Sequence, residues 1–226
     1  ENVSVGHGFG DSSFNVFGNS VMDGNLSFTN GYIGISQDTT TGPIRIGNAA
    51  GATSQGDYSV AIGNNMGQTG QGTESVAIGN NAGQTGQGNN SVAIGNNAGF
   101  TTQGNGTIAI GRKAGFTTQG TNSVAIGNNA GDNSQSSNSV AIGNNAGNTN
   151  QGANSVAIGP NTLCQNNSSV ALGSGATTTA DNQIVLGTAS ETVLIPGILD
   201  GYLSGSDVSG SIPLTVSWSG GTYYGR

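Results

Sequence analysis

Residues 91–99 read SVAIGNNAG, and the same nine letters return at 123–131 and 139–147, with the close variant SVAIGNNMG at 59–67. No side chain in this phrase is an acid, a base or a strong nucleophile. A repeated phrase of this kind serves a protein by stacking, because each unit buries its apolar side against its neighbours. The repeat therefore predicts an architecture before it predicts any chemistry.

The copies keep a regular spacing along the chain. Ile-Gly pairs begin at positions 46, 62, 78, 94, 110, 126, 142 and 158, one every 16 residues, and Leu-Gly pairs follow at 172 and 186 after steps of 14. A fixed period in this range is typical of solenoid proteins, in which each coil contacts its neighbours. We expect the solenoid to span residues 43–190.

Alternation within the phrase predicts the structure of one coil. Val and Ile alternate with Ser, Ala and Gly, so the two sets point to opposite sides of a strand. The following Asn-Asn suits a turn with positive φ, and a second short segment, such as AGQTGQG at 82–88, must run back. Frequent Gly and β-branched residues oppose a helix. The predicted fold class is all-β, a parallel β-solenoid whose coils stack about 4.8 Å apart into a rod roughly 45–50 Å long.

The alternation leaves open which side of the strand faces inward. If Val and Ile fill the roll, one chain needs no partner. If Ala lies inside, Val and Ile form an apolar stripe along the rod, and three copies packed around a threefold axis would cover it. In either arrangement the residues of this core or trimer-interface set are Val60, Ile62, Val76, Ile78, Val92, Ile94, Ile108, Ile110, Val124, Ile126, Val140, Ile142, Val156, Ile158, Val170, Leu172, Val185 and Leu186.

The composition argues against several classes of partner. The chain has 226 residues, of which 42 are Gly and 7% are charged, with a formal net charge of −7. Four Lys and Arg residues give no cationic face for nucleic acid. The single Cys164 allows no disulfide within the chain and no Cys/His metal site. No apolar run approaches the roughly 20 residues of a membrane helix, and we expect no cofactor.

Two neighbouring coils depart from the repeat. Arg112 and Lys113 stand where other coils have Asn-Asn, while Phe100 and Phe116 take positions that hold Gln in the preceding coils. Aromatic rings beside two cations form a candidate ligand patch for a sugar or an acidic polymer. In the alternative interpretation, the rings fill the roll or a subunit groove and the cations are solvated turn residues.

Residue types used in catalysis occur near the start of the chain. His7, Asp11 and Ser12 are the types of a nucleophilic triad, but a Gly-rich stretch offers no scaffold to hold a hydrogen-bonded base. The nearby GxGxG at 6–10 lacks the following helix of a dinucleotide site. The scattered acidic residues form no recognisable calcium loop. We therefore expect no enzyme.

The repeated motif resembles a known family. SVAIG every 14 to 16 residues, often preceded by Asn as at Asn122-Ser123, Asn138-Ser139 and Asn154-Ser155, is similar to the head domain of YadA-like trimeric autotransporter adhesins. The resemblance covers about two thirds of the chain. It implies a left-handed parallel β-roll, an obligate homotrimer with the SVAIG strands facing its centre, extracellular display on a cell surface, adhesion to a host or matrix surface, and no catalysis.

The two ends lack the phrase. Residues 1–42 are expected to form an irregular β cap, and residues 191–226, with the apolar segments TVLIPGIL and SIPLTVSW, a C-terminal β segment. This last segment would serve as a trimer foot or as an assembly strand for an end-to-end filament. Residues 178–197 are similar to phrases that follow such repeats in phage and large-virus fibre proteins. A virion surface is therefore a second expected location.

The predicted function is a rigid adhesive or structural fibre module that mediates attachment. Its expected partners are further copies of the chain and a glycan or host-surface ligand, with no nucleic acid and no membrane span. One alternative is an ice-binding β-solenoid that uses flat ladders of Thr and Asn. Another is the non-catalytic part of a phage depolymerase fibre.

Overall fold

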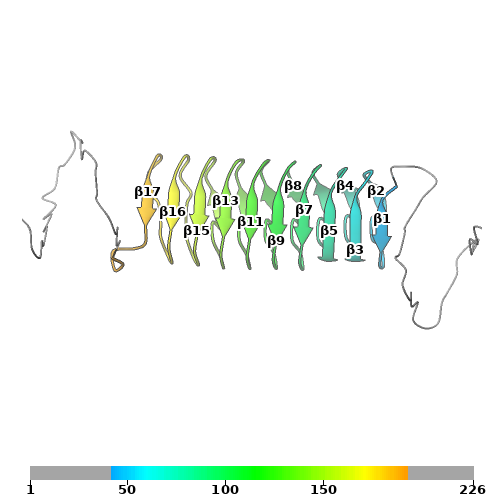
Figure 1. Cartoon of the computed structure of the whole chain (residues 1–226), viewed down its shortest axis with the longest axis horizontal. Coiled ribbons are helices and arrows are strands. Elements are labelled where there is room, and N and C mark those ends of the chain that lie inside the picture. The colour runs from blue at the N-terminus through cyan, green and yellow to red at the C-terminus, as the bar shows by residue number, and fades with distance from the viewer. Residues whose placement is uncertain (1–41, 193–226) are drawn as a thin grey trace, which may run out of the picture.

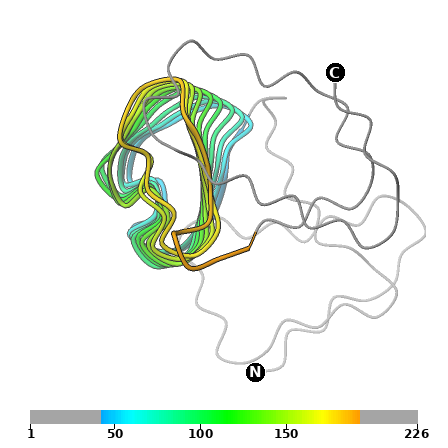
Figure 2. The ribbon, with the colours of Figure 1, turned by 90° about the vertical axis from the view of Figure 1, so that its left-hand side faces the viewer.

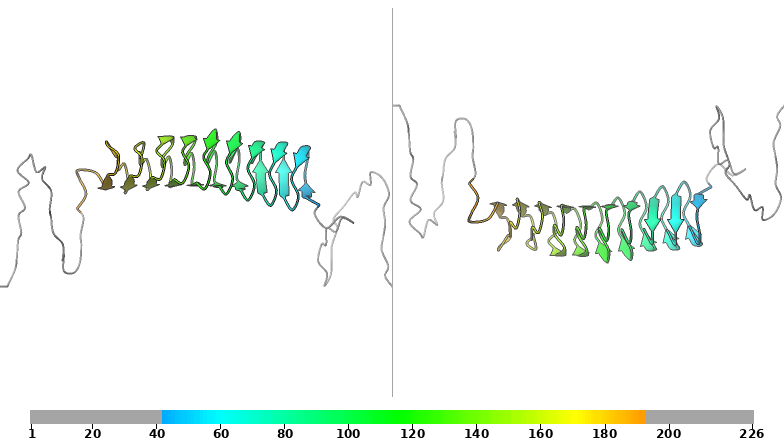
Figure 3. Two further views of the ribbon diagram at one scale, coloured as in Figure 1. Left: turned by 90° about the horizontal axis from the view of Figure 1, so that it is seen from above. Right: turned by 90° about the horizontal axis from the view of Figure 1, so that it is seen from below.

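A computed structural model describes residues 42–192 of the chain. Within this range there is no helix, and the seventeen short strands β1–β17 form two parallel sheets of ten and seven strands. The strands stack side by side into a straight rod (Figure 1). Seen from above and below, the rod consists of two rows of strands joined by turns (Figure 3). The predicted parallel β-solenoid is confirmed.

The larger sheet holds one strand from every coil, and the smaller sheet holds the returning strands. The ten-stranded sheet contains β1 Ile44–Ile46, β3 Val60–Asn64, β5 Val76–Asn80, β7 Val92–Ile94, β9 Ile108–Ile110, β11 Val124–Ile126, β13 Val140–Ile142, β15 Val156–Ile158, β16 Val170–Leu172 and β17 Ile184–Leu186. The seven-stranded sheet contains β2 Thr53–Gln55, β4 Thr69–Gln71, β6 Thr85–Gln87, β8 Thr102–Gln103, β10 Thr118–Gln119, β12 Asn133–Gln135 and β14 Thr149–Gln151.

The period of the sequence becomes the register of the sheets. In the larger sheet Ala93 lies opposite Ala109, and Ala109 lies opposite Ala125, each one period further along the chain. The step shortens to 14 residues between β15 and β16, where Ala157 lies opposite Ala171. Identical residues therefore form columns that run along the rod, which is what a repeat of constant length produces.

The burial of the strands decides which side faces inward. The alanine at the centre of each strand β3, β5, β7, β9, β11, β13, β15 and β16 is 0% exposed. Its apolar neighbours are half-buried, as in the intermediate–buried–intermediate pattern of Val124–Ile126. Viewed end on, the coils superpose, and the ten-stranded sheet forms the flat side of an outline that is indented on the opposite side (Figure 2). Alanine therefore lines the interior, and Val and Ile cover the flat outer side.

Glutamine, for which the sequence analysis assigned no role, fills much of the narrow interior. Gln71, Gln87, Gln103, Gln119, Gln135 and Gln151 are at most 3% exposed. Gln119 Nε2 donates to the backbone oxygens of Ile108, at 2.9 Å, and Ser123, at 3.3 Å. The other glutamines of the column make the matching bond to the strand that precedes them. The side chain thus ties the smaller sheet to the larger one.

The turn after each strand of the larger sheet has the predicted backbone. Its second residue lies in the left-handed region, with φ of 57° at Asn97, 53° at Asn129 and 53° at Asn145. Asparagine tolerates this conformation better than most residues, which explains its recurrence. The same position holds Lys113, with φ of 55°. Lysine is a poor choice for such a turn on conformational grounds.

The smaller sheet ends before the larger one. After β14 the coils shorten, and the returning segment is reduced to a single bridge between Leu163 and Thr177. Cys164 is buried there, and its Sγ lies 3.3 Å from the backbone oxygen of Ser169. The expected N-terminal cap lies outside the described residues except for residue 42, and the expected C-terminal segment lies outside them beyond residue 192. Over residues 42–192, no helix is long and apolar enough to span a membrane.

Candidate self-association face and ligand strip

The flat side of the rod carries two adjacent apolar columns, which we call the Val/Ile face. It is formed by Val60, Ile62, Val76, Ile78, Val92, Ile94, Ile108, Ile110, Val124, Ile126, Val140, Ile142, Val156, Ile158, Val170, Leu172, Ile184 and Leu186. Most of these side chains are half-buried by their neighbours in the column, and Leu172 and Leu186 are 44% and 45% exposed. A continuous apolar surface along a whole molecule is typical of an interface.

One member of the predicted set lies elsewhere. The register places Ile184 opposite Val170 and Val185 opposite Ala171. Val185 therefore belongs to the inward column and packs against the small core cluster around Ala157, Cys164, Ala171 and Ala176. The sequence analysis placed Val185 beside Leu186, because both are large and apolar. The strict alternation of a strand puts adjacent residues on opposite sides, and Ile184 takes the outer position, 72% exposed.

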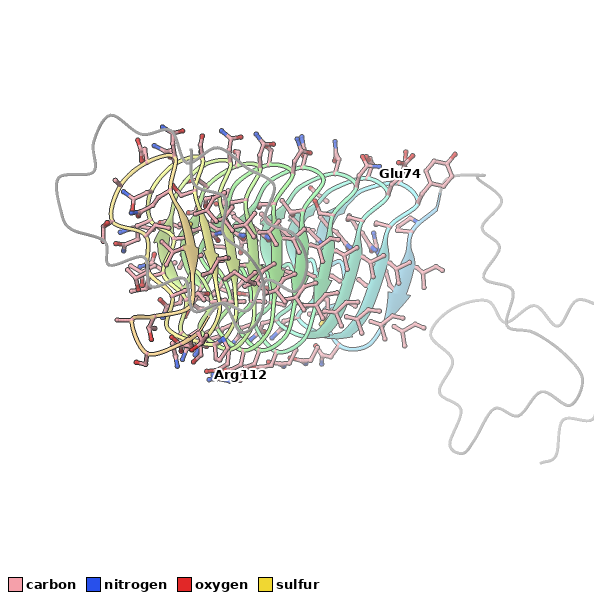
Figure 4. All side chains as sticks on the ribbon, turned by 60° about the vertical axis from the view of Figure 1, so that its left-hand side comes forward. Glu74 and Arg112 are labelled. Carbon is pink, nitrogen blue, oxygen red and sulfur yellow. The ribbon has the colours of Figure 1, made fainter. Side chains whose placement is uncertain are left out.

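Polar columns border the Val/Ile face. Figure 4 shows Glu74 and Arg112 at opposite edges of the coils. Along the edge that carries Arg112, exposed amides bond from coil to coil, as from Asn80 Nδ2 to Asn64 Oδ1 at 3.3 Å and from Asn96 Nδ2 to Asn80 Oδ1 at 3.2 Å. An apolar centre with a polar rim is the usual composition of a protein interface.

The candidate ligand patch lies on the other side of the coil. The rings of Phe100 and Phe116 stack with centroids 5.0 Å apart and planes inclined by 19°. Lys113 Nζ lies 5.0 Å from the centroid of the Phe116 ring, which places the ammonium over the aromatic face. Arg112 is exposed in the neighbouring column. The structure therefore brings three of the four predicted residues into direct proximity, with the fourth adjacent in sequence.

Asp132 is a charged neighbour that the sequence analysis did not single out. It occupies the position of Phe116 in the next coil, exactly one period later in the sequence, which was the signal that could have found it. Partial burial raises the pKa of its carboxyl above the ordinary 3.8, while the charges of Lys113 and Arg112 act to lower it. Asp132 thus shares the electrostatic environment of the two cations.

An open hollow of about 220 Å³ lies further along the same side. Its lining residues are Asn145, Asn148, Asn161 and Leu163. Asn145 follows Lys113 by two periods and Asn148 follows Phe116 by two periods, so the hollow and the patch share the same two columns. We call these two columns, from Phe100 to Asn161, the axial strip.

Candidate catalytic and metal positions add little. His7, Asp11, Ser12 and the GxGxG at 6–10 lie outside the described residues. Within residues 42–192 no group of three or more His, Cys, Asp or Glu side chains is placed to hold a metal ion.

Comparison with known proteins follows from this geometry. The profile of the YadA head domain repeat matches residues 46–65, 71–83, 87–98, 117–130, 151–162 and 166–190, which are distributed over nearly the whole rod. These are YadA-like head repeats. Among solved structures, the collagen-binding domain of the Yersinia adhesin YadA matches the chain with a TM-score of 0.48 and 24% sequence identity, over 76% of this chain and 93% of that one. A search of curated proteins finds no match.

The YadA-like repeats explain why the same positions recur in every coil. Each matched segment includes a strand of the larger sheet or the turn that follows it. Phe100, Arg112, Lys113 and Phe116 fall in the gap between the matched segments 87–98 and 117–130. The candidate ligand patch is therefore a feature of this chain that the repeat profile does not include.

Proposed function

We propose that this chain is a non-catalytic adhesive and structural module of an extracellular fibre, built as a homotrimer of parallel rods. The fibre would be displayed on a cell or virion surface, where a stiff rod holds a binding surface away from its anchor. Residues 43–190 would form the rod, with residues 1–42 as the N-terminal cap and residues 191–226 as the trimer foot or assembly strand.

The Val/Ile face carries this proposal. Its side chains belong to all ten strands of the larger sheet, whereas the interior holds mainly alanine, serine and glutamine. Apolar side chains gain about 25 cal/mol for each Å² removed from water, so covering this face would supply stabilisation that the small interior side chains cannot. Association through the flat sides provides that cover.

Closed threefold symmetry fits the shape of the rod. A flat face repeated three times around an axis encloses an apolar centre and leaves no apolar stripe in water, which limits further growth. The family of the repeats supports the same arrangement, because YadA-like heads belong to trimeric adhesins. Their adhesive role is the reason for proposing attachment as the function.

A single substitution on the Val/Ile face tests the trimer. Ile126→Glu places a charge at the middle of the face, whereas Thr118→Glu places the same charge on an exposed position of the smaller sheet. Light scattering should give the mass of three chains for the natural protein and for Thr118→Glu. The mass should fall to that of one chain for Ile126→Glu, because burying an unpaired carboxylate costs several kcal/mol.

The natural protein itself provides the decisive outcome. A stable monomer would overturn the trimer and bring the ice-binding alternative forward, with inhibition of ice growth as its assay. A larger and polydisperse mass would overturn a closed trimer and favour the filament. Adhesion is tested separately, by coating beads with the protein and counting their attachment to a cell layer; beads that attach no better than uncoated ones would reduce the proposal to a structural role.

A further inference from the structure

The axial strip contains a local change of chemistry that the fold does not require. Its second column reads Gln68, Gln84, Phe100, Phe116, Asp132 and Asn148 in successive coils, and every one of these side chains is half-buried at the surface. Coils with glutamine or asparagine here stack in the same register as coils with phenylalanine. The two rings therefore do not fill the roll, which excludes one part of the structural interpretation.

The cations are equally unnecessary for the fold. Arg112 and Lys113 replace the Asn-Asn of the neighbouring coils, and Lys113 adopts a left-handed φ of 55° that asparagine accepts more readily. Residues 42–192 contain three cations, Arg45, Arg112 and Lys113, so two of the three lie in this one turn. A costly conformation and a concentration of charge at the same place indicate a function other than stability.

We propose that the axial strip binds an anionic saccharide, meaning a chain of sugars that carries carboxylate or sulfate groups. The stacked rings of Phe100 and Phe116 offer apolar surface for the C–H face of a sugar. Lys113 and Arg112 offer charge-assisted hydrogen bonds to its acidic group. Asp132 and the amides of the strip accept from and donate to sugar hydroxyls.

The arrangement of the strip favours a linear ligand over a single sugar. The hollow lined by Asn145, Asn148, Asn161 and Leu163 continues the same columns two coils beyond Lys113 and Phe116. Two coils correspond to about 10 Å along the rod. A saccharide that lies parallel to the rod axis would contact the aromatic and cationic patch first, then Asp132, and then the amide-lined hollow.

The strip remains accessible in the trimer. The chain that carries it passes directly behind the larger sheet, because a Cβ on Gly115 would lie 3.5 Å from the Cβ of Ala109, whose strand bears the Val/Ile face outward. The strip and that face therefore lie on opposite sides of a thin coil. The ligand site rests on the proposed function only for its copy number, since a trimer would present three strips and gain avidity for a polymer.

The repeat itself supplies conservative variants for the test. Arg112→Asn with Lys113→Asn restores the turn of the neighbouring coils, and Phe116→Gln restores the residue of Gln84. Arg45→Gln removes a cation from β1, outside the strip, and is the charge control. Calorimetry on the full-length protein should use heparin as the sulfated probe, polygalacturonate as the carboxylated probe and dextran as the neutral probe, with mass and melting temperature recorded for each variant.

We expect the natural protein to bind at least one anionic probe, more weakly as salt increases, and to bind dextran at least tenfold more weakly. The double Asn variant and Phe116→Gln should each lose about tenfold in affinity, with mass and melting temperature maintained, while Arg45→Gln binds normally. Heparin binding without polygalacturonate binding would identify sulfate as the recognised group, and the reverse would identify carboxylate.

Three results would overturn the saccharide site. These are no binding of any probe, an equal loss in Arg45→Gln, or dextran binding as tight as that of the anionic probes. A natural protein that is trimeric and adhesive but binds no saccharide would refute this site and leave the proposed function intact. A monomer that binds the anionic probes would have the opposite meaning.

Discussion

Gln119 illustrates how one buried polar side chain supports a coil with a small interior. It is 1% exposed and donates hydrogen bonds to the backbone oxygens of Ile108 and Ser123. Its Oε1 is buried without a hydrogen-bond partner, as in the other five glutamines of the column. The amide thus gains its stabilising effect from Nε2 and from the volume that the side chain fills.

Truncation of this side chain should destabilise the rod. Gln119→Ala removes both hydrogen bonds and leaves a cavity, so the free energy of unfolding should fall by about 2–4 kcal/mol. Denaturant unfolding followed by circular dichroism measures the change. Thr118→Ala, at the exposed neighbouring position, should stay within about 0.5 kcal/mol of the natural protein. Equal stability of the two variants would contradict a structural role for the glutamine column.

Asp132 should make the stability of the rod depend on pH. Burial raises the pKa of its carboxyl in the folded state, so the folded protein favours the protonated form. Its contribution is therefore most favourable below the unfolded pKa and is lost as the pH rises from about 3.8 through the higher folded pKa. Asp132→Asn, which uses the residue found at 148, should be more stable than the natural protein at neutral pH.

The advantage of Asp132→Asn should shrink as the pH falls, because the natural carboxyl is then neutral as well. Unfolding measured from about pH 3 to about pH 7 tests this trend. Asp57→Asn removes the same charge from an exposed turn and serves as the control for net charge. A constant difference between Asp132→Asn and the natural protein across the range would show that burial of the carboxyl is unimportant.

At the scale of the element, the glycine after each strand of the larger sheet sets the contact between coils. Gly127 has φ of +131°, and a Cβ on it would lie 2.5 Å from the backbone oxygen of Gly143 in the next coil. Any side chain would force the two coils apart at this corner. The Ile-Gly pair that marks the period is therefore a requirement of backbone packing.

Gly127→Ala should cost more than the conformational penalty alone. Gly70 also has a positive φ, of +71°, but a Cβ there would meet nothing closer than 4.0 Å. We expect Gly70→Ala to lower the free energy of unfolding by about 1–2 kcal/mol and Gly127→Ala to lower it clearly further, because only the second adds a clash with backbone. Similar losses for the two variants would refute the close contact between coils.

At the scale of the whole molecule, the rod behaves as a one-dimensional stack. Each coil pairs with the coil before it and the coil after it, and contacts between strands join neighbours in each sheet. The stability of such a molecule is approximately a sum over coils and their interfaces. Length is then a property that the chain can change without changing its cross-section.

Removal of one complete coil should shorten the rod and preserve its fold. Deletion of residues 75–90 joins Glu74 to Ser91, which is the same junction of turn and strand as Glu74 to Ser75. Small-angle scattering should show a rod about 4.8 Å shorter with the same mass ratio to the single chain. Deletion of residues 75–82 removes half a coil and should abolish folding, because it shifts every later column out of register. A folded half-coil deletion would contradict the columnar stack.

The sequence by itself determined the period, the strands and the parallel stack, because identical residues at constant spacing can satisfy their neighbours only when they are aligned. It also identified the turn asparagines and the unusual residues Phe100, Arg112, Lys113 and Phe116. The direction of the strand faces depended on the tertiary structure, since alternation is symmetric and Val and Ile fit either side. The narrow coil leaves room inside for alanine and glutamine, and this excluded volume is the physical reason that the apolar columns face outward.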